Sequence, residues 1–364
     1  MVVAMPAGRA LSFLLVIVAL SAGAGLLYAA LTNGQSYTAG MVYGACIGLC
    51  ISSVERGLVF GDILQRARRW PTWLYIPVCE AASVVLVALG FALGGAVSWT
   101  TGLLPVPFLE ATVPSLRIMI YALIVAAALV FVTRVRDLLG REVFKSLLTG
   151  RYHRPVEERR IFLFLDLVGS TAYARQHGDL RAQEFLGAVF AAIAEPIERH
   201  SGTIEDYVGD MAMITWPEAR GLHDARCICC VFAIQQVFAE QEGEWRRRYG
   251  QVPTFRAALH GGPVVTAEIG IDRHKISYFG DVVNTTGRLE SLARQLGVSV
   301  LISADLLRRC PALPRYVQPR PHGSHMLHGR EQPLEVFAIE QIAKPDTQVA
   351  GVAAATAPWA KRYA

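Results

Sequence analysis

The sequence predicts a chain of two structural classes: an all-α bundle of four apolar helices, followed by an α+β domain. Hydrophobic residues make up 53% of the 364-residue chain, and the mean hydropathy is +0.35. This excess lies before residue 134, whereas the remainder alternates strand-like and helical patterns. We therefore expect residues 1–133 to form the helical bundle, 134–156 a linker, 157–342 the α+β domain and 343–364 a disordered tail.

Four apolar segments have the length of a membrane span. The first is too long for a removed signal peptide and has no convincing cleavage region. Tryptophans flank the third segment, as in the aromatic belt of a membrane protein. The predicted spans cover residues 10–31, 36–54, 73–97 and 116–133.

Arginines lie in the second connection and directly after residue 133, whereas the first and third connections have no lysine or arginine. The positive-inside rule therefore predicts that both termini and the α+β domain are in the cytoplasm. We expect a multi-pass protein of the cell inner membrane. The net charge of +5 is explained by these arginines, so it does not predict a nucleic-acid partner.

The sequence allows more than one role for several residues of the apolar segments. Glu80 is the one acid placed inside a predicted span, and either a buried hydrogen bond or the sensing of a ligand fits it. Cys46, Cys50 and Cys79 fit helix packing or a redox or soft-metal sensor. No histidine precedes residue 150, which argues against a histidine-ligated haem.

The linker has apolar residues at helical spacing, among them Val135, Leu139, Val143 and Leu147. This pattern fits a short parallel coiled coil between two protomers. It also fits an amphipathic helix that lies on the membrane surface.

The α+β domain begins with a buried strand that ends in a single acid. The run IFLFLDL, residues 161–167, is apolar except for Asp166, and Gly169 follows it. A carboxylate delivered to the end of a buried strand must be paired or bound to a metal ion.

A second acid follows in the pattern TIEDYVGDMAMITW, which predicts a hairpin with Asp210 at its turn. Two carboxylates at the ends of neighbouring strands are typical oxygen ligands of Mg²⁺. The alternative is that Asp210 is a solvated turn residue.

The third motif is SYFGDVVNTTGRLE, in which a strand ends at Gly280 and a helix follows. Asn284 and Arg288 lie four residues apart and therefore share one face of that helix. An amide and a guanidinium so placed suit a ribose oxygen and a phosphate oxygen.

The remaining pattern completes the alternation of strands and helices. We expect the cysteine cluster at 227, 229 and 230 to lie in the core, and His260, in a tight turn HGGP between two strands, to be structural. The expected elements are a helix ending before Gly202, a helix over 224–249, strands over 254–259 and 264–269, the strand VSVLIS, a helix to residue 309 and the strand LEVFAIE.

FLDLVGST, the YVGD hairpin and FGDVVNTTGRLE, in this order and at these separations, resemble the catalytic domain of the class III nucleotidyl cyclases over about residues 157–341. The resemblance implies a ferredoxin-like α+β domain that cyclises a nucleoside triphosphate to a 3′,5′-cyclic monophosphate and releases pyrophosphate. It also implies two Mg²⁺ or Mn²⁺ ions, held by Asp166, Asp210 and the backbone carbonyl of Leu167. Asn284 would then orient the ribose, and Arg288 would stabilise charge at the α-phosphate.

In this family the site lies between two catalytic domains, one of which supplies the metal ligands and the other the asparagine and arginine. This chain carries both halves once. The resemblance therefore implies a homodimer with two shared sites.

Base selection follows less directly. Asp206 and Ser277 stand where the family selects the base, and an acid at the first position is closer to the guanylate pattern. Lys275 is a further candidate donor to adenine, and Arg330 stands where the family often has a phosphate-binding lysine. We expect ATP to be the substrate, with GTP as the alternative.

Two other classes of protein also have to be considered. A membrane receptor that binds nucleotide without turnover is disfavoured by the presence of both aspartates, the asparagine and the arginine. A diguanylate cyclase with a palm-like sheet is disfavoured because the hairpin contains YVGD in place of a GGDEF-like sequence.

Overall fold

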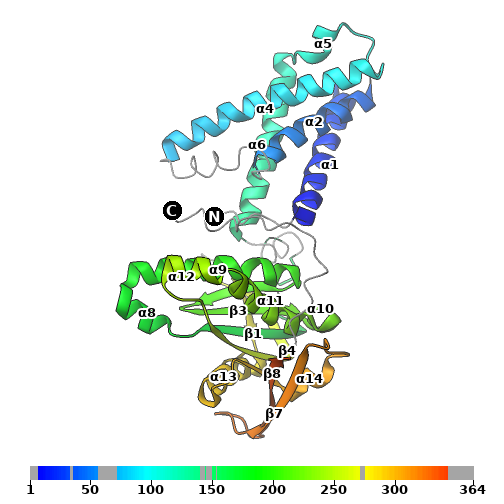
Figure 1. The fold of residues 1–364 in the computed structure, drawn as a ribbon. Coiled ribbons are helices and arrows are strands. Elements are labelled where there is room, and N and C mark those ends of the chain that lie inside the picture. The colour runs from blue at the N-terminus through cyan, green and yellow to red at the C-terminus, as the bar shows by residue number, and fades with distance from the viewer. Residues whose placement is uncertain are drawn as a thin grey trace. The chain divides into compact units, whose positions relative to one another are not determined.

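A computed structural model of the chain describes residues 7–32, 36–55, 72–139, 144, 150–152, 154–270 and 275–342. They belong to two compact units, one within residues 4–144 and one within residues 145–364. Figure 1 shows the elements of both.

The N-terminal unit is entirely helical. Its helices are α1 (Ala7–Leu31), α2 (Tyr37–Glu55), α4 (Thr72–Thr100), α5 (Phe108–Thr112) and α6 (Leu116–Leu139). Four segments in it are long and apolar enough to cross a membrane, as the sequence predicts: Leu14–Leu31, Tyr37–Val54, Ala81–Thr100 and Phe108–Leu129.

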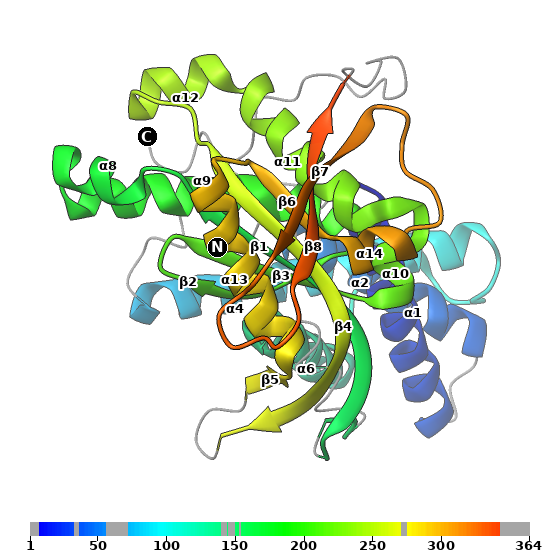
Figure 2. The same cartoon turned by 90° about the horizontal axis from the view of Figure 1, so that it is seen from below.

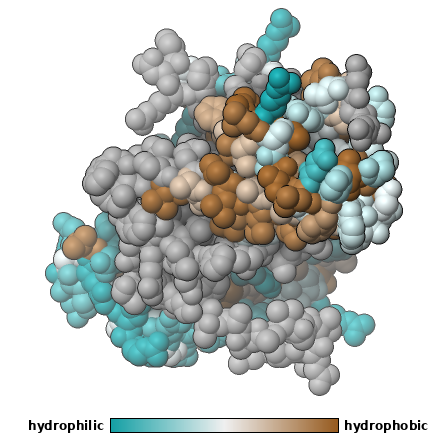
Figure 3. Space-filling view, turned by 90° about the horizontal axis from the view of Figure 1, so that it is seen from above, coloured by the Kyte–Doolittle hydropathy of each residue, from teal (hydrophilic) through white to brown (hydrophobic). Residues whose placement is uncertain are grey.

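The outer surface of this unit is rich in apolar side chains (Figure 3). Large exposed ones include Leu15, Val85, Leu116, Ile124 and Phe131. Such a surface is unfavourable in water and suits a lipid environment. Inside the unit, α1 and α2 approach so closely at Gly25 and Gly40 that neither position has room for a side chain.

Three details differ from the expectation or lie outside it. The fourth long helix continues to Leu139, so the first residues of the predicted linker extend α6. The third connection contains the short helix α5. Val143 and Leu147 of the predicted coiled coil, and the side chains of Glu80 and Cys79, lie outside the described residues.

The C-terminal unit is an α+β domain built on an eight-stranded sheet, which confirms the predicted fold class. The strand order is β2-β3-β1-β4-β6-β8-β7, and β5 pairs with β4. The strands are β1 (Val156–Leu167), β2 (Thr203–Val208), β3 (Met211–Pro217), β4 (Phe255–Ile269), β5 (Lys275–Phe279), β6 (Val300–Ser303), β7 (Val317–His325) and β8 (Leu334–Gln341). The helices are α8 (Ser170–His177), α9 (Asp179–Arg199), α10 (Glu218–Leu222), the 3₁₀ helix η1 (His223–Ala225), α11 (Arg226–Glu240), α12 (Glu242–Tyr249), α13 (Asp281–Leu296) and α14 (Ala304–Arg309).

The central strand β1 has a different environment on each face. Ile161, Leu163 and Leu165 pack into the large core beneath α9 and α11. Phe162 and Phe164 point to the opposite face and join a smaller cluster with residues of α13. Figures 1 and 2 show these helices on opposite sides of the sheet. Because side chains alternate along a strand, the face that carries Phe162 and Phe164 also carries Asp166.

The two strands predicted on either side of HGGP are wrong, because β4 is one continuous strand of 15 residues. Gly261 and Gly262 pair with Ile161 and Arg160 of β1 and form no turn. On the side of β4 away from β1, β6 pairs with residues 257–259 and β5 with residues 265–269. Pro263 lies between these two stretches, where no described strand pairs with that side of β4. A proline there removes no ladder hydrogen bond.

Other boundaries also differ. The predicted helix over 224–249 is interrupted at Gln241, and the one after Asp166 is interrupted at Gly178, where φ is +83°. Strand β7 has no counterpart among the predicted elements, because Pro319 and Pro321 argue against a strand, yet it lies at the edge of the sheet, where proline is tolerated. The expected tail, 343–364, lies outside the described residues.

Two structural expectations are confirmed. Of the cysteine cluster, Cys227 and Cys230 are fully buried in the core, whereas Cys229 is only partly buried. His260 is 6% exposed, and its Nδ1 lies 2.7 Å from the Oγ of Ser303, which caps α14.

Candidate active site

Asp166 is the penultimate residue of β1 and is 7% exposed. Its register partners are Met211 of β3 and Arg256 of β4. The strand therefore places the carboxylate at its own C-terminal end, near the β2–β3 turn. The next residue, Leu167, turns its side chain into the core.

Asp210 lies in that turn, after Gly209, which adopts a φ of +64°. The backbone carbonyl of Asp210 accepts a hydrogen bond from the N–H of Leu167, at 3.3 Å. Its carboxylate accepts a hydrogen bond from the hydroxyl of Ser170, at the start of α8. These contacts tie the hairpin turn to the end of β1, so Asp210 is not a free turn residue.

The environment of Asp166 disfavours its ionised form. The pKa of Asp166 is raised to about 6, mainly by burial and then by the negative charges of Asp210 and Glu290. The positive charges of Arg294 and Arg256 oppose this rise. The Nη2 of Arg294 lies 3.0 Å from Asp166 Oδ2, and the Nη1 of Arg256 lies 3.9 Å from the same oxygen.

This donor set suits a hard divalent cation. Asp166 and Asp210 supply only oxygen ligands, and a cation between them would offset their mutual repulsion. Among the described residues no group of three or more His, Cys, Asp or Glu side chains could hold a metal ion. Water, backbone and substrate oxygens would therefore have to complete the coordination, as is usual for Mg²⁺.

Asn284 and Arg288 lie in the first half of α13, and Asn284 is exposed. The Nη1 of Arg288 is buried and makes no hydrogen bond to the described residues. Its closest recorded partner is Asp281 Oδ1, at 3.9 Å. A buried guanidinium N–H without an acceptor is a suitable donor to an anionic oxygen.

Arg330 lies close to the same helix start. Its Nη1 is 3.7 Å from Asp281 Oδ2 and donates to Thr285 Oγ1, at 3.3 Å. Arg288 and Arg330 therefore share one carboxylate and together carry an excess of positive charge. The structure brings these two predicted phosphate ligands together.

The three residues predicted to contact the base lie on two strands. Asp206 is in β2, and Lys275 and Ser277 are in β5. The Nζ of Lys275 is 2.5 Å from Asp206 Oδ2, although the two residues are 69 positions apart. The acid at this position is therefore paired with a cation.

Among the described residues, no hydrogen bond or ion pair joins Asn284 or Arg288 to Asp166 or Asp210. Arg294, which contacts Asp166, lies six residues after Arg288 and ten after Asn284, or about 9 and 15 Å along the helix axis. The N-terminal half of α13 packs beside Phe162 and Phe164 of β1.

The sequence analysis missed four neighbours of the carboxylates: Ser170, Arg256, Glu290 and Arg294. Glu290 and Arg294 are four residues apart on α13, and the Arg294 Nη2 is 3.2 Å from Glu290 Oε1. Asn284 and Arg288 have the same spacing, so this pattern in the sequence could have identified Glu290 and Arg294 as a second pair on one face of α13. Arg256 gave no signal, because only the pairing of β4 with β1 places it beside Asp166.

Comparison with known proteins identifies the family of the C-terminal domain. Residues 154–340 match the family described as the adenylate and guanylate cyclase catalytic domain. Adenylate cyclase 2 of Rhizobium meliloti (strain 1021) is 48% identical over 289 residues, which cover 79% of this chain and 79% of that protein. Adenylate cyclase 1 of the same strain is 27% identical over 198 residues, 53% of this chain and 29% of that protein.

A solved structure of a bacterial light-regulated adenylyl cyclase is similar in fold, with a TM-score of 0.50 and 18% sequence identity over 60% of this chain and 65% of that chain. The family match covers half of the sequence, and the relative with 48% identity extends over most of it. The chain therefore belongs to the class III adenylate and guanylate cyclase family and is a nucleotidyl cyclase.

Proposed function

We propose that this protein is a membrane-bound adenylate cyclase that converts ATP to 3′,5′-cyclic AMP and pyrophosphate in a homodimer. The observation that carries the proposal is the meeting of Asp166 and Asp210 at the end of β1, where burial and the charge of Asp210 raise the pKa of Asp166. A site that holds a buried carboxylate beside a second, partly buried one is suited to divalent cations.

Asp166 and Asp210 would hold two Mg²⁺ or Mn²⁺ ions, with the backbone carbonyl of Leu167 as a further ligand. When bound, such ions lower the pKa of the ribose 3′-hydroxyl and neutralise the charge of the triphosphate. Because the proton of Asp166 must leave before a cation binds, the site is competent only when that carboxyl is ionised.

The other named residues act on the nucleotide. The amide of Asn284 orients the ribose, so that the 3′-oxygen attacks the α-phosphorus in line with the leaving pyrophosphate. The guanidinium of Arg288 donates to the α-phosphate oxygens as their charge increases, and its buried Nη1 has a free hydrogen for that bond. Arg330 neutralises charge on the phosphates that leave.

A homodimer would account for the lack of a described contact between Asn284 or Arg288 and the two carboxylates of the same chain. One protomer would supply the carboxylates and the other the asparagine and arginine. Asp210→Ala and Arg288→Ala proteins should each be inactive, and their mixture should recover up to about a quarter of the wild-type activity, because one of the two sites in a heterodimer is intact. No recovery in co-expressed and co-purified heterodimers would refute the shared site.

The choice of ATP rests on two observations. The relative with 48% identity is an adenylate cyclase. The ion pair of Asp206 with Lys275 also leaves the acid less available to accept hydrogen bonds from guanine. The presence of an acid at position 206 favours GTP as the second candidate.

The full-length protein in detergent, incubated with ATP and GTP separately, tests the activity and the base. Manganese-dependent formation of cyclic AMP with release of pyrophosphate supports the proposal. Cyclic GMP alone would transfer it to the second candidate, and nucleotide binding without pyrophosphate release would identify a receptor without turnover.

The four apolar helices would place the protein in the inner membrane with both termini in the cytoplasm. Retention in membranes after alkaline extraction, together with cleavage of a C-terminal tag only from the cytoplasmic side, is the expected result. Release of the protein by alkali would contradict it.

A further inference from the structure

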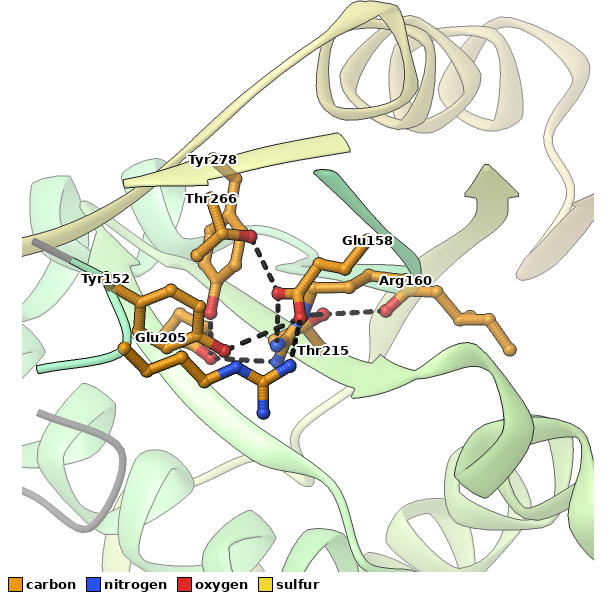
Figure 4. A network of polar contacts seen from close by, with 9 residues as sticks. Tyr152, Glu158, Arg160, Glu205, Thr215, Thr266 and Tyr278 are labelled. Carbon is orange, nitrogen blue, oxygen red and sulfur yellow. Dashed lines mark hydrogen bonds and ion pairs between the residues drawn. The ribbon is translucent and has the colours of Figure 1, made fainter. Parts of the chain in front are cut away.

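A buried guanidinium lies on β1, on the same face as Asp166. Arg160 is 3% exposed, and its Nε donates to Thr215 Oγ1 at 3.1 Å and its Nη1 to Glu158 Oε1 at 3.0 Å. Its Nη2 is 3.5 Å from Glu205 Oε1. Figure 4 shows this network. Because a buried charge is unfavourable unless it is paired, these groups are held together as a set.

Tyr278 closes the network from β5. Its ring lies under the guanidinium of Arg160, 4.9 Å from the centroid, and its hydroxyl donates to Glu205 Oε1 at 2.7 Å. The ring also makes an edge contact with Phe162, at 5.4 Å between centroids. Strand β5 pairs with β4, and side chains alone connect it to β2 in the described pairings.

Glu205 lies at a bulge in β2. The register of β2 against β3 shifts between Ile204 and Asp206, so Glu205 is an extra residue. Asp206 consequently stands opposite Met213, on the face of α13. Without the bulge it would stand opposite Ala212, whose side chain is in the core beneath α9 and α11.

We propose that Arg160, Glu205 and Tyr278 form a clamp that positions the base-recognition residues of the cyclase. This inference rests on the proposed function, in which Asp206 and Ser277 contact the base. Glu205 directly precedes Asp206, and Tyr278 directly follows Ser277. The clamp therefore fixes the bulge in β2 and the distance between β2 and β5, which together set where the base-contacting side chains stand.

The clamp is anchored away from the base. Glu158 accepts a hydrogen bond from Thr266 Oγ1 at 2.7 Å, and Tyr152, which is 5% exposed, directs its hydroxyl to the other carboxylate oxygen at 3.5 Å. The guanidinium of Arg160 is thus held from both ends. Such preorganisation maintains a binding geometry without contact with the ligand.

The position of the clamp predicts which kinetic parameter it controls. Phe162 and Phe164 separate Arg160 from Asp166 along the same face of β1. The clamp therefore does not contact the carboxylates of the proposed metal site. Its loss should alter binding of the base more than the chemical step.

The test uses Glu205→Gln and Tyr278→Phe in the full-length protein. Tyr278→Phe removes the hydroxyl but keeps the ring beside Arg160, so the fold is disturbed little. Each variant should raise KM for the preferred nucleotide about five- to twentyfold and change the ATP to GTP ratio of kcat/KM at least about fivefold, with kcat within about threefold. In the double variant, the increase in KM should be smaller than the product of the two single-variant increases, because both substitutions affect the same hydrogen bond between Tyr278 and Glu205.

Glu218→Gln is the matched control. The Glu218 side chain is 15% exposed, against 10% for Glu205, and it also pairs with arginines. It is the first residue of α10, and its partners are Arg159 and Arg309, which are not part of the clamp. This variant should leave KM and the nucleotide ratio unchanged. A shift of the ratio in Glu218→Gln equal to that in Glu205→Gln would show a general loss of order and would overturn the clamp.

Asp206→Asn distinguishes a failure of the clamp from a failure of the proposed base recognition. If Asp206→Asn changes the nucleotide ratio while Glu205→Gln and Tyr278→Phe leave KM and the ratio within twofold of wild type, the clamp is refuted and the proposed base recognition stands. If Asp206→Asn has no effect on the ratio either, the proposed recognition fails, and the clamp fails with it.

Discussion

Asp166 and Arg294 form an ion pair, with 3.0 Å between Oδ2 and Nη2, although 128 positions separate them in the chain. The arginine side chain is 58% exposed, whereas that of the aspartate is 10% exposed. A solvated cation thus occupies one oxygen of a buried carboxylate that we assign to a metal site. The guanidinium of Arg294 and a bound metal ion would therefore compete for the carboxylate of Asp166.

Arg294→Gln is expected to lower the Mg²⁺ concentration needed for half-maximal activity. An exposed ion pair contributes about 0.2–1 kcal/mol, which corresponds to a change of about 1.4- to fivefold. Cyclase activity titrated with Mg²⁺ at saturating nucleotide measures the change. Arg308→Gln, which removes an equally exposed arginine on α14, should leave the titration unaltered, and a higher Mg²⁺ requirement in Arg294→Gln would contradict the competition.

Asp166→Asn is expected to stabilise the metal-free protein at neutral pH. The pKa of Asp166 is raised to about 6 in the folded domain, against about 3.9 in an unfolded chain. The folded state therefore binds the proton more tightly, and the stability contributed by this group is lost as the pH rises from 4 through 6. At pH 7.5 the variant should gain about 1–3 kcal/mol, and at pH 4 or below the gain should vanish.

Thermal unfolding of the full-length protein in EDTA at both pH values provides the measurement. A substitution of the exposed Asp305 to Asn serves as the control. Equal melting temperatures of wild type and Asp166→Asn at pH 7.5 would show that Asp166 is not strained in the metal-free state.

His260 should contribute a loss of stability in mild acid, opposite in sign to the contribution of Asp166 over the same pH range. Burial, followed by the charge of Arg330, lowers the pKa of His260 to about 4 from its ordinary 6.5. The unfolded chain then takes up a proton first, so stability present above pH 6.5 is lost as the pH falls toward 4, by about 1 kcal/mol per pH unit. Between pH 6.5 and 4.5 the melting temperature of His260→Gln should therefore rise relative to that of wild type, and an unchanged difference between the two proteins would exclude this role of His260.

Lys275→Ala should shift the base preference toward GTP. The substitution releases the Asp206 carboxylate from its ion pair at 2.5 Å, and a free carboxylate accepts hydrogen bonds from the guanine edge. We expect the ATP to GTP ratio of kcat/KM to fall about tenfold, which corresponds to about 1.4 kcal/mol. Product analysis by chromatography gives the ratio, and an increased preference for ATP would show that Lys275 does not restrain Asp206.

Most of the individual elements that carry the site were predictable, because each depends on local chemistry. The apolar run of β1 with one acid, the glycine at the β2–β3 turn and the helix start after Gly280 are local patterns, and they located Asp166, Asp210, Asn284 and Arg288. Strand β7 and the continuity of β4 were not predictable from prolines and glycines, because whether a proline is tolerated depends on which edge of the strand has a partner.

By itself, the sequence determined the two structural classes, the apolar helices and the identities of the chemical groups, since hydrophobic periodicity and side-chain chemistry are properties of short segments. The tertiary structure alone decided which groups meet. Arg294 reaches Asp166, Lys275 reaches Asp206, and Arg160 joins Glu205 to Tyr278 only after the sheet has formed. Such contacts depend on strand order, register and one bulge, and these are set by the packing of the whole domain.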